Sequence, residues 1–246
     1  MKIFFHAGRY FILLSRVFSK PEKQKVYLRL VIREMDSLGI NSLGIVIIIS
    51  IFMGAVITLQ TAYNLENPLI PTYLIGLTAR DSMILEFSST IVGLILAGKV
   101  GSNIASEIGT MRISEQIDAL EIMGVNSASY LILPKIIAAV LINPFLTIIS
   151  IFVGIFGGYL AAVFTGAVSP ASYIYGIHYV FIPFYITYAL VKTVFFAFII
   201  TSVPAYHGYY ASGGALEVGR SSTRAVVFSS ILILLFNVLL TQLLLA

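Results

Sequence analysis

The sequence predicts an all-α integral membrane protein with an amphipathic N-terminal helix at the membrane interface, five transmembrane helices and one short cytoplasmic helix. Composition is the first reason, because 59% of the 246 residues are hydrophobic and only 11% are charged. Such a chain has too few polar residues to cover a soluble globular protein. The second reason is a series of long uncharged runs, and the third is the uneven placement of Lys and Arg around them.

Residues 1–20 form an amphipathic pattern. At roughly 100° per residue, four basic side chains lie within about 40° of one another and apolar side chains lie opposite. The basic residues are Lys2, Arg9, Arg16 and Lys20, and the apolar ones are Phe4, Ala7, Phe11, Leu14 and Phe18. A short first span is the alternative, but two arginines would make spanning costly, so a helix lying in the interface is favoured.

The distribution of basic residues predicts the orientation of the chain. Eight of the 15 Lys and Arg lie in the first forty positions, where a second amphipathic segment is expected over residues 22–40, ending at Gly39. Thirteen fall on the side of the N-terminus, whereas Arg80 is the only one in the opposite loops. Because cytoplasmic loops carry an excess of Lys and Arg, the N-terminus is expected inside and the C-terminus outside.

The spans are expected at residues 41–63, 82–99, 127–165, 177–203 and 225–246, as one membrane domain that follows the interfacial segment 1–40. Outer loops are expected at 64–80 and 166–172, and inner polar segments at 98–124 and 204–224. Pro134 and Pro144 are expected to break the third span, while Gly154, Gly157 and Gly158 permit close helix packing.

Metal and nucleotide sites are not expected on this chain. It has no cysteine, and His6, His178 and His207 are widely scattered. Residues 93–100, GLILAGKV, match the phosphate-loop pattern except at its last position. They lie in an apolar helix, however, where no backbone nest can form around a phosphate. If the protein uses ATP and Mg²⁺, another chain is expected to bind them.

Residues 114–124 predict a short cytoplasmic helix, with Ser114 as its N-cap and Gly124 at its end. One side is apolar and the other carries an acid every three residues. The apolar residues are Ile113, Ile117 and Leu120, and the acids are Glu115, Asp118 and Glu121. Two interpretations fit: a solvated helix on the bilayer, or a docking helix whose acids meet basic residues of a cytoplasmic partner.

Two long motifs resemble a known family. Residues 98–125, GKVGSNIASEIGTMRISEQIDALEIMGV, and residues 210–227, YASGGALEVGRSSTRAVV, closely resemble signatures of the MlaE/YrbE permeases, the membrane subunits of MCE-associated ABC transporters. The resemblance extends over essentially the whole chain. It implies a homodimer that assembles with a cytoplasmic ATPase and with a periplasmic ring of MCE-domain proteins. The ATPase, and not this chain, would bind ATP and Mg²⁺.

The resemblance also implies a function. It implies a non-catalytic permease that moves phospholipids or related lipids between the inner and outer membranes of a diderm bacterium, with no nucleic-acid partner. Residues 107–124 would include the coupling helix that meets the ATPase. The residues assigned to coupling on this basis are Glu107, Arg112, Glu115, Gln116, Asp118 and Glu121.

The chain departs from the family pattern in places. Early in the second span the family commonly has Arg-Glu-Leu-Gly-Pro, whereas residues 85–89 read LEFSS here, so Glu86 is kept but the Arg and Pro are not. Family members often have Asp-Pro where Asn126 and Ser127 stand, and an Asp near Asn237. These departures limit any transfer of lipid-headgroup roles beyond Glu86.

Depth in the membrane predicts a polar layer without reference to any family. Glu86 lies 13 residues before Lys99, Asn237 lies 13 after Arg224, and Lys192 lies 12 before Pro204. At 1.5 Å per residue, Glu86, Lys192 and Asn237 all lie roughly 20 Å from the inner surface. An acid and a base at one depth are expected to pair, either as a structural clamp or as the floor of an outward-facing lipid cavity.

Acyl chains of the lipid are expected near the outer ends of the first two spans. The candidate residues are Leu59, Tyr63, Leu65, Tyr73, Ile75 and Leu77, together with Glu86. Two other functions stay open. Residues 118–124, DALEIMG, are similar to the E-A-A-x-x-x-G loop of solute-importing ABC permeases. A membrane-embedded lipid enzyme is the other alternative, although no catalytic constellation supports it.

Overall fold

The computed structural model describes residues 2–19, 24–65 and 70–245, and within them the chain is helical without strands. In chain order the elements are α1 (Lys2–Phe18), α2 (Gln24–Met35), η1 (Asp36–Ile40), α3 (Asn41–Asn64), α4 (Tyr73–Ser82), η2 (Met83–Ile91), α5 (Val92–Leu96), η3 (Ala97–Gly101), α6 (Ser102–Ile113), α7 (Gln116–Ile122), α8 (Ser127–Thr165), α9 (Pro170–His178), α10 (Phe184–Tyr209) and α11 (Ala215–Leu245). The η elements are π-helical segments inside longer helices. Lys20, one of the four basic residues of the predicted interfacial helix, lies outside the described residues.

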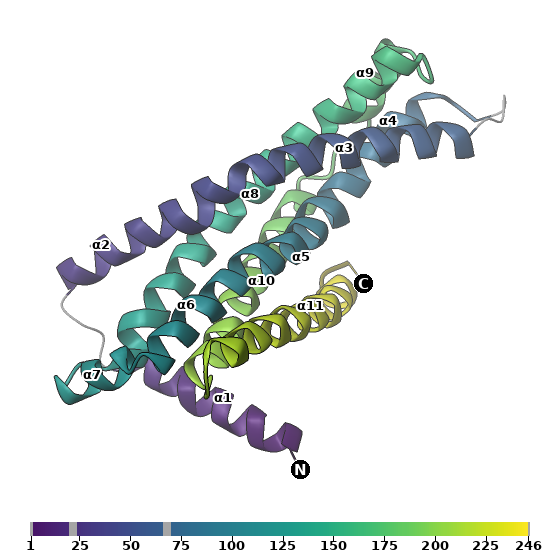
Figure 1. The fold of residues 1–246 in the computed structure, drawn as a ribbon. Coiled ribbons are helices and arrows are strands. Elements are labelled where there is room, and N and C mark those ends of the chain that lie inside the picture. The colour runs from purple at the N-terminus through teal and green to yellow at the C-terminus, as the bar shows by residue number, and fades with distance from the viewer. Residues whose placement is uncertain (1, 20–23, 66–69, 246) are drawn as a thin grey trace.

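Five helices are long and apolar enough to cross a membrane, which confirms the predicted number of spans. They are Tyr27–Asn64, Tyr73–Ile113, Ser127–Thr165, Phe184–Tyr209 and Ala215–Leu245. Figure 1 shows α3 and α8 side by side, with α4 and α9 at one end of the molecule and α1 and α7 at the other. The α3–α8 contact is close because Gly54 of α3 lies directly against the backbone of Gly154 in α8.

The first two spans are longer than predicted. Gly39 does not end the second amphipathic segment, because α2 continues through η1 into α3. The predicted outer loop 64–80 contains α4, and the helix that begins there continues to Ile113. Residues 98–113 are therefore not a separate polar segment. They remain helical because Ile104 and Ile108 form a buried face of α6, which packs against α10 and α11.

The later boundaries also differ from the prediction. Pro134 and Pro144 lie inside α8 without breaking it, since packing against neighbouring helices compensates for a lost backbone hydrogen bond. The predicted outer loop 166–172 already contains the start of α9. The predicted fourth span is interrupted after α9 and resumes with α10. Pro204 lies within α10, its ring packed against Gly101, so the inner loop is shorter than the predicted 204–224.

The N-terminal helix α1 docks on the half of the bundle that also holds α7 (Figure 1). The hydroxyl groups of Tyr10 and Ser202 are 2.7 Å apart, and Asn126 Nδ2 donates to the Arg16 carbonyl over 2.9 Å. Burial raises the pKa of the Tyr10 hydroxyl above its usual value. The opposite face of α1 exposes large apolar side chains, as a helix in a lipid interface requires. They are Phe4, Phe5, Phe11, Ile12 and Phe18.

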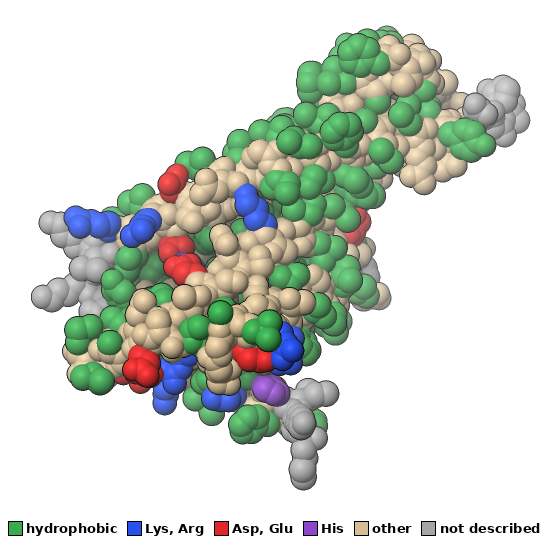
Figure 2. All heavy atoms as spheres, viewed as in Figure 1, with side chains coloured by type: hydrophobic (Ala, Val, Ile, Leu, Met, Phe, Trp, Pro, Cys, Tyr) green, Lys and Arg blue, Asp and Glu red, His purple; other side chains and the backbone are tan. Residues whose placement is uncertain are grey.

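Charged side chains are concentrated at the end of the molecule that holds α1, α2 and α7, and the opposite end is mainly apolar on the face shown in Figure 2. This concentration of charge at one end of the molecule matches the uneven distribution of Lys and Arg along the sequence.

Candidate functional site

The candidate site lies where η2, α10 and α11 meet in the middle of the bundle. Lys192 Nζ on α10 is 3.1 Å from Glu86 Oε1 on η2, and Asn237 Nδ2 on α11 donates to Glu86 Oε2 over 3.1 Å. The structure therefore brings together the three residues that the depth argument placed in one layer. An unpaired charge at this depth costs about 3 kcal/mol, so each partner offsets part of that cost.

Further polar groups complete the network. The Thr90 hydroxyl lies within donating distance of Glu86 Oε2 (3.1 Å) and Asn237 Oδ1 (3.0 Å). Lys192 Nζ also donates to the Tyr188 hydroxyl over 3.0 Å. Thr90 and Tyr188 were not predicted from the sequence, nor was Thr241, whose hydroxyl is 2.7 Å from that of Tyr188.

A sequence signal could have found these partners. Thr90 lies four residues after Glu86, Tyr188 four before Lys192, and Thr241 four after Asn237. Side chains separated by four positions are neighbours on one face of a helix.

The network is open on one side. The Lys192 side chain is completely buried, whereas that of Glu86 is 41% exposed. Glu86 belongs to the nine-residue π-helical segment η2, and the Leu85 carbonyl of that segment accepts a hydrogen bond from Lys192 Nζ over 3.1 Å. The wider π turn is a feature often found at functional sites. A polar ligand can therefore reach Glu86 while Lys192 stays fixed behind it.

The helix α7, which the sequence predicts to be cytoplasmic, begins later than predicted. Ser114 is not its N-cap, because the Ser114 hydroxyl donates to the Thr110 carbonyl over 2.8 Å. Glu115 instead takes a left-handed backbone conformation (φ 60°), and the helix begins at Gln116. Gly124, with φ 78°, follows the helix at the predicted position, where a left-handed residue suits glycine.

Two of the three acids near α7 have partners within the chain. Asp118 Oδ1 is 2.6 Å from Arg112 Nη1. Glu121 Oε1 accepts hydrogen bonds from the hydroxyl groups of Ser127 (2.9 Å) and Tyr209 (3.0 Å). Of the three acids, only Glu115 has a side chain without a polar partner among the described residues.

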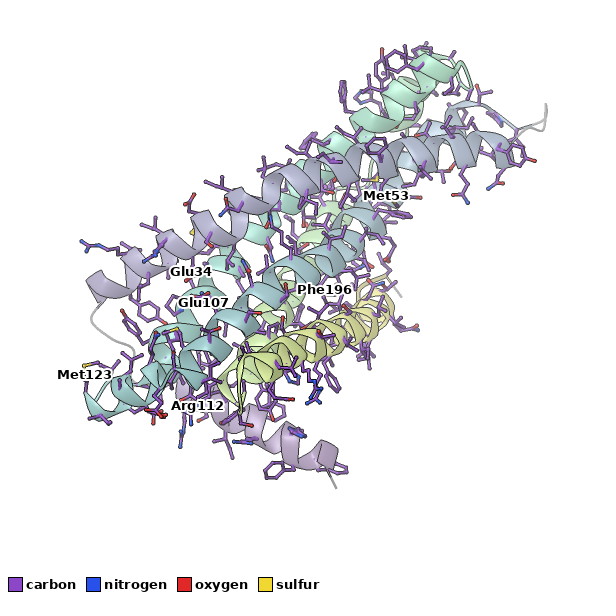
Figure 3. All side chains as sticks on the ribbon, in the orientation of Figure 1. Glu34, Met53, Glu107, Arg112, Met123 and Phe196 are labelled. Carbon is purple, nitrogen blue, oxygen red and sulfur yellow. The ribbon has the colours of Figure 1, made fainter. Side chains whose placement is uncertain are left out.

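Apolar residues of α7 point in two directions. Ile117 is fully buried, as the predicted apolar side requires, whereas the side chains of Ile122 and Met123 are 87% and 68% exposed. Figure 3 labels Met123 and Arg112 at this end of the molecule. The exposed pair forms an apolar tip on an otherwise charged surface.

Glu107, a predicted coupling residue, belongs to an ion cluster around the buried Lys135. Lys135 Nζ is 2.8 Å from Glu107 Oε2 and 2.8 Å from Glu34 Oε1. Figure 3 shows Glu34 on α2 and Glu107 on α6 facing each other across this cluster. Glu107 also borders an open hollow of roughly 480 Å³ on the surface of α6. Lys135 therefore joins three helices, which the sequence analysis did not predict.

The predicted acyl-chain residues have different environments. Tyr63 and Leu59 are exposed on α3, as a lipid contact requires. Leu65 and Leu77 are partly buried, and Tyr73 packs its ring against those of Tyr175 and Tyr179. Ile75 is buried in a core with Tyr173, so the structure gives it a packing role rather than a lipid contact. Within the described residues, no group of three His, Asp or Glu side chains could hold a metal ion.

Sequence comparison identifies the family. The model of the MlaE permease family, described as Permease MlaE, matches residues 31–243. The chain belongs to the MlaE permease family. It is similar to a probable ABC transporter permease protein of Rickettsia prowazekii (37% identical over 238 residues, 95% of this chain and 88% of the relative). The polar network thus lies in the transmembrane bundle of an ABC transporter permease, a transport subunit and multi-pass membrane protein.

Two further relatives carry functional names. The intermembrane phospholipid transport system permease protein MlaE of Haemophilus influenzae is 32% identical over 232 residues, covering 94% of this chain and 88% of the relative. The chloroplastic protein TRIGALACTOSYLDIACYLGLYCEROL 1 of Arabidopsis thaliana is 31% identical over 231 residues, covering 94% and 66%.

Proposed function

We propose that this MlaE-family permease moves phospholipids or related lipids between the inner and outer membranes, driven by ATP hydrolysis on a separate subunit. The observation that carries the proposal is the polar network around Glu86, which is buried at Lys192 and open at Glu86. A lipid headgroup is polar and its chains are apolar, so it needs such a group within an apolar bundle. The names of the Haemophilus and Arabidopsis relatives support a lipid substrate.

In this proposal the permease acts as one membrane domain within a homodimer. The span α11 supports this, because only 17% of its 18-residue apolar stretch is buried within the single chain. Its exposed large side chains include Phe228, Ile231, Leu235 and Val238. A cytoplasmic ATPase carrying ATP and Mg²⁺ would dock on α7 from the inner side. A periplasmic ring of MCE-domain proteins would receive or deliver the lipid on the outer side. The protein would reside in the inner membrane of a diderm bacterium.

The polar network is tested by removing its charges singly and together. Glu86→Gln leaves Lys192 without its carboxylate, and Lys192→Met leaves Glu86 without its ammonium group. We expect either change to lower ATP-driven lipid transport by the reconstituted complex about tenfold or more, which corresponds to about 1.4 kcal/mol in the limiting step.

The double variant Glu86→Gln/Lys192→Met separates function from a structural clamp. It carries no unpaired buried charge, so it should assemble with the ATPase as the wild type does. If the network handles lipid, the double variant assembles but still fails to transport. Normal transport by the double variant would mean that the pair is only a clamp, and the proposal would be wrong.

A further inference from the structure

Arg80 is a buried arginine on the side of the membrane where the sequence places no other Lys or Arg. It lies near the C-terminal end of α4, and its side chain is only 2% exposed. A cation buried at the end of an apolar helix is costly unless all of its donors are satisfied. Neither the charge bias nor the polar network around Glu86 accounts for this residue.

The Arg80 guanidinium is saturated by one acid and three backbone carbonyls. Its Nε and Nη2 atoms lie 2.9 and 2.8 Å from Asp81 Oδ1. Its Nη1 donates to the carbonyls of Ile177 (2.7 Å) and Tyr179 (2.9 Å), and Nη2 lies 3.3 Å from that of Val180. These carbonyls belong to the end of α9 and to the connection that leads into α10. The planar fork of arginine can reach all of them at once, whereas a lysine ammonium cannot.

The connection that Arg80 holds is strained. Val180 has φ 42°, and the left-handed region is unfavourable for a β-branched residue. The last carbonyls of α9 lack partners within the helix, so the guanidinium both satisfies them and fixes the unusual backbone. Arg80 thus fastens the start of α10 to the end of α4. We call Arg80, Asp81 and the three carbonyls the outer clasp.

The two helices that the outer clasp joins are the two that carry the central ion pair. Glu86 follows Arg80 by six residues on α4 and η2, and Lys192 follows Val180 by twelve residues. A half-open cavity of roughly 370 Å³ lies beside the clasp, with Arg80, Ile84, Ile151, Ile177 and Ile186 among its lining residues. The start of α10 therefore borders open space on one side, and packing there does not by itself fix its position against η2.

From this arrangement we infer that Arg80 is a positioning residue, which keeps α10 in register with η2 so that Lys192 meets Glu86. The register of α10 against η2 can be measured without any transport assay. Only the importance of this register for lipid transport rests on the proposed function. Loss of the clasp should let the start of α10 move into the cavity and separate the pair.

The absence of cysteine from the chain allows a direct test of the register. A Cβ built on Gly93 of α5 would lie 3.7 Å from the Cβ of Phe196 on α10, a distance that suits a disulfide. Phe196, which is labelled in Figure 3, follows Lys192 by four residues on α10. We expect Arg80→Gln to slow disulfide formation in the Gly93→Cys/Phe196→Cys protein about tenfold, equivalent to about 1.4 kcal/mol.

A second cysteine pair and two other variants serve as controls. The hydroxyl oxygens of Ser50 on α3 and Ser150 on α8 are 2.8 Å apart, so Ser50→Cys/Ser150→Cys reports a contact outside the clasp. Its rate should not change with Arg80→Gln. Arg220→Gln, which removes an exposed arginine paired with Glu217, should leave both rates unchanged. Arg80→Lys should behave like Arg80→Gln, because charge without the fork cannot hold three carbonyls.

Three results would overturn the inference. One is an unchanged rate for the Gly93/Phe196 pair, and another is an equal slowing of both pairs, which would mean general loosening. The third is full recovery with Arg80→Lys, which would assign the effect to charge alone. None of these measurements needs transport. In the transport assay, Arg80→Gln should add no further loss in a Glu86→Gln background, whereas additive losses would show that Arg80 does not act through the pair.

Discussion

At the scale of single residues, the buried basic side chains are each satisfied differently. Lys192 meets one carboxylate and two oxygen acceptors, Lys135 meets two carboxylates, and Arg80 meets one carboxylate and three carbonyls. Lysine presents a compact charge with three donors, whereas arginine presents a planar fork with five. This difference explains why arginine is found where several backbone carbonyls must be bound at once. The acids around Lys135 differ in exposure, 19% for Glu34 and 54% for Glu107.

This difference in exposure predicts an order of stability. Lys135→Met leaves two carboxylates facing each other near the bundle interior, and we expect the thermal midpoint in detergent to fall by about 5 °C or more. Glu34→Gln should cost less, and Glu107→Gln least, because water already screens the more exposed carboxylate. The triple variant with all three changes should recover most of the loss. A larger drop for Glu107→Gln than for Glu34→Gln would contradict this account.

At the scale of elements, α7 is anchored by its acids and exposes an apolar tip. Asp118 and Glu121 hold the helix to α6, α8 and α10 through Arg112, Ser127 and Tyr209. Reversing all three acids would therefore disturb the helix itself. If an ATPase docks on α7 as proposed, the exposed residues that it can contact there include Ile122, Met123 and Glu115.

A matched set of variants tests that surface. Ile122→Asp and Met123→Asp place charge at the exposed tip, so we expect them to reduce copurification of the ATPase about tenfold with the permease's thermal midpoint unchanged. Ile117→Asp buries a charge and should instead lower the thermal midpoint. Glu115→Lys tests whether charge alone contributes to binding of the ATPase. If the ATPase copurifies normally with both tip variants, α7 does not dock through this surface.

At the scale of the whole molecule, the distribution of basic residues predicts which loops face the cytoplasm. Two exposed positions without charge, Ala167 between α8 and α9 and Gly214 before α11, are suited to a test in a chain without cysteine. A membrane-impermeant maleimide should label Ala167→Cys in cells with a permeabilised outer membrane. It should label Gly214→Cys only after the inner membrane is opened, because that loop is expected inside. The reverse pattern would invert the proposed orientation.

The sequence by itself determined the number of spans, the amphipathic N-terminal helix and the common depth of Glu86, Lys192 and Asn237. Those features follow from hydrophobic runs, helical periodicity and a fixed rise per residue, which are local properties. It could not determine where helices end, because packing of Ile104 and Ile108 keeps the polar residues 98–113 helical and packing around Pro134 and Pro144 keeps α8 intact.

Only the tertiary structure decided the partners of the charged residues. Asp118 and Glu121 near α7 have intramolecular partners, Lys135 joins α2 to α6, and Arg80 holds carbonyls 97 to 100 positions away along the chain. The sequence does not reveal which backbone carbonyls accept side-chain hydrogen bonds, because every residue has a carbonyl group. The network around Glu86 is the exception, because burial in an apolar bundle forces the few polar side chains at one depth to meet.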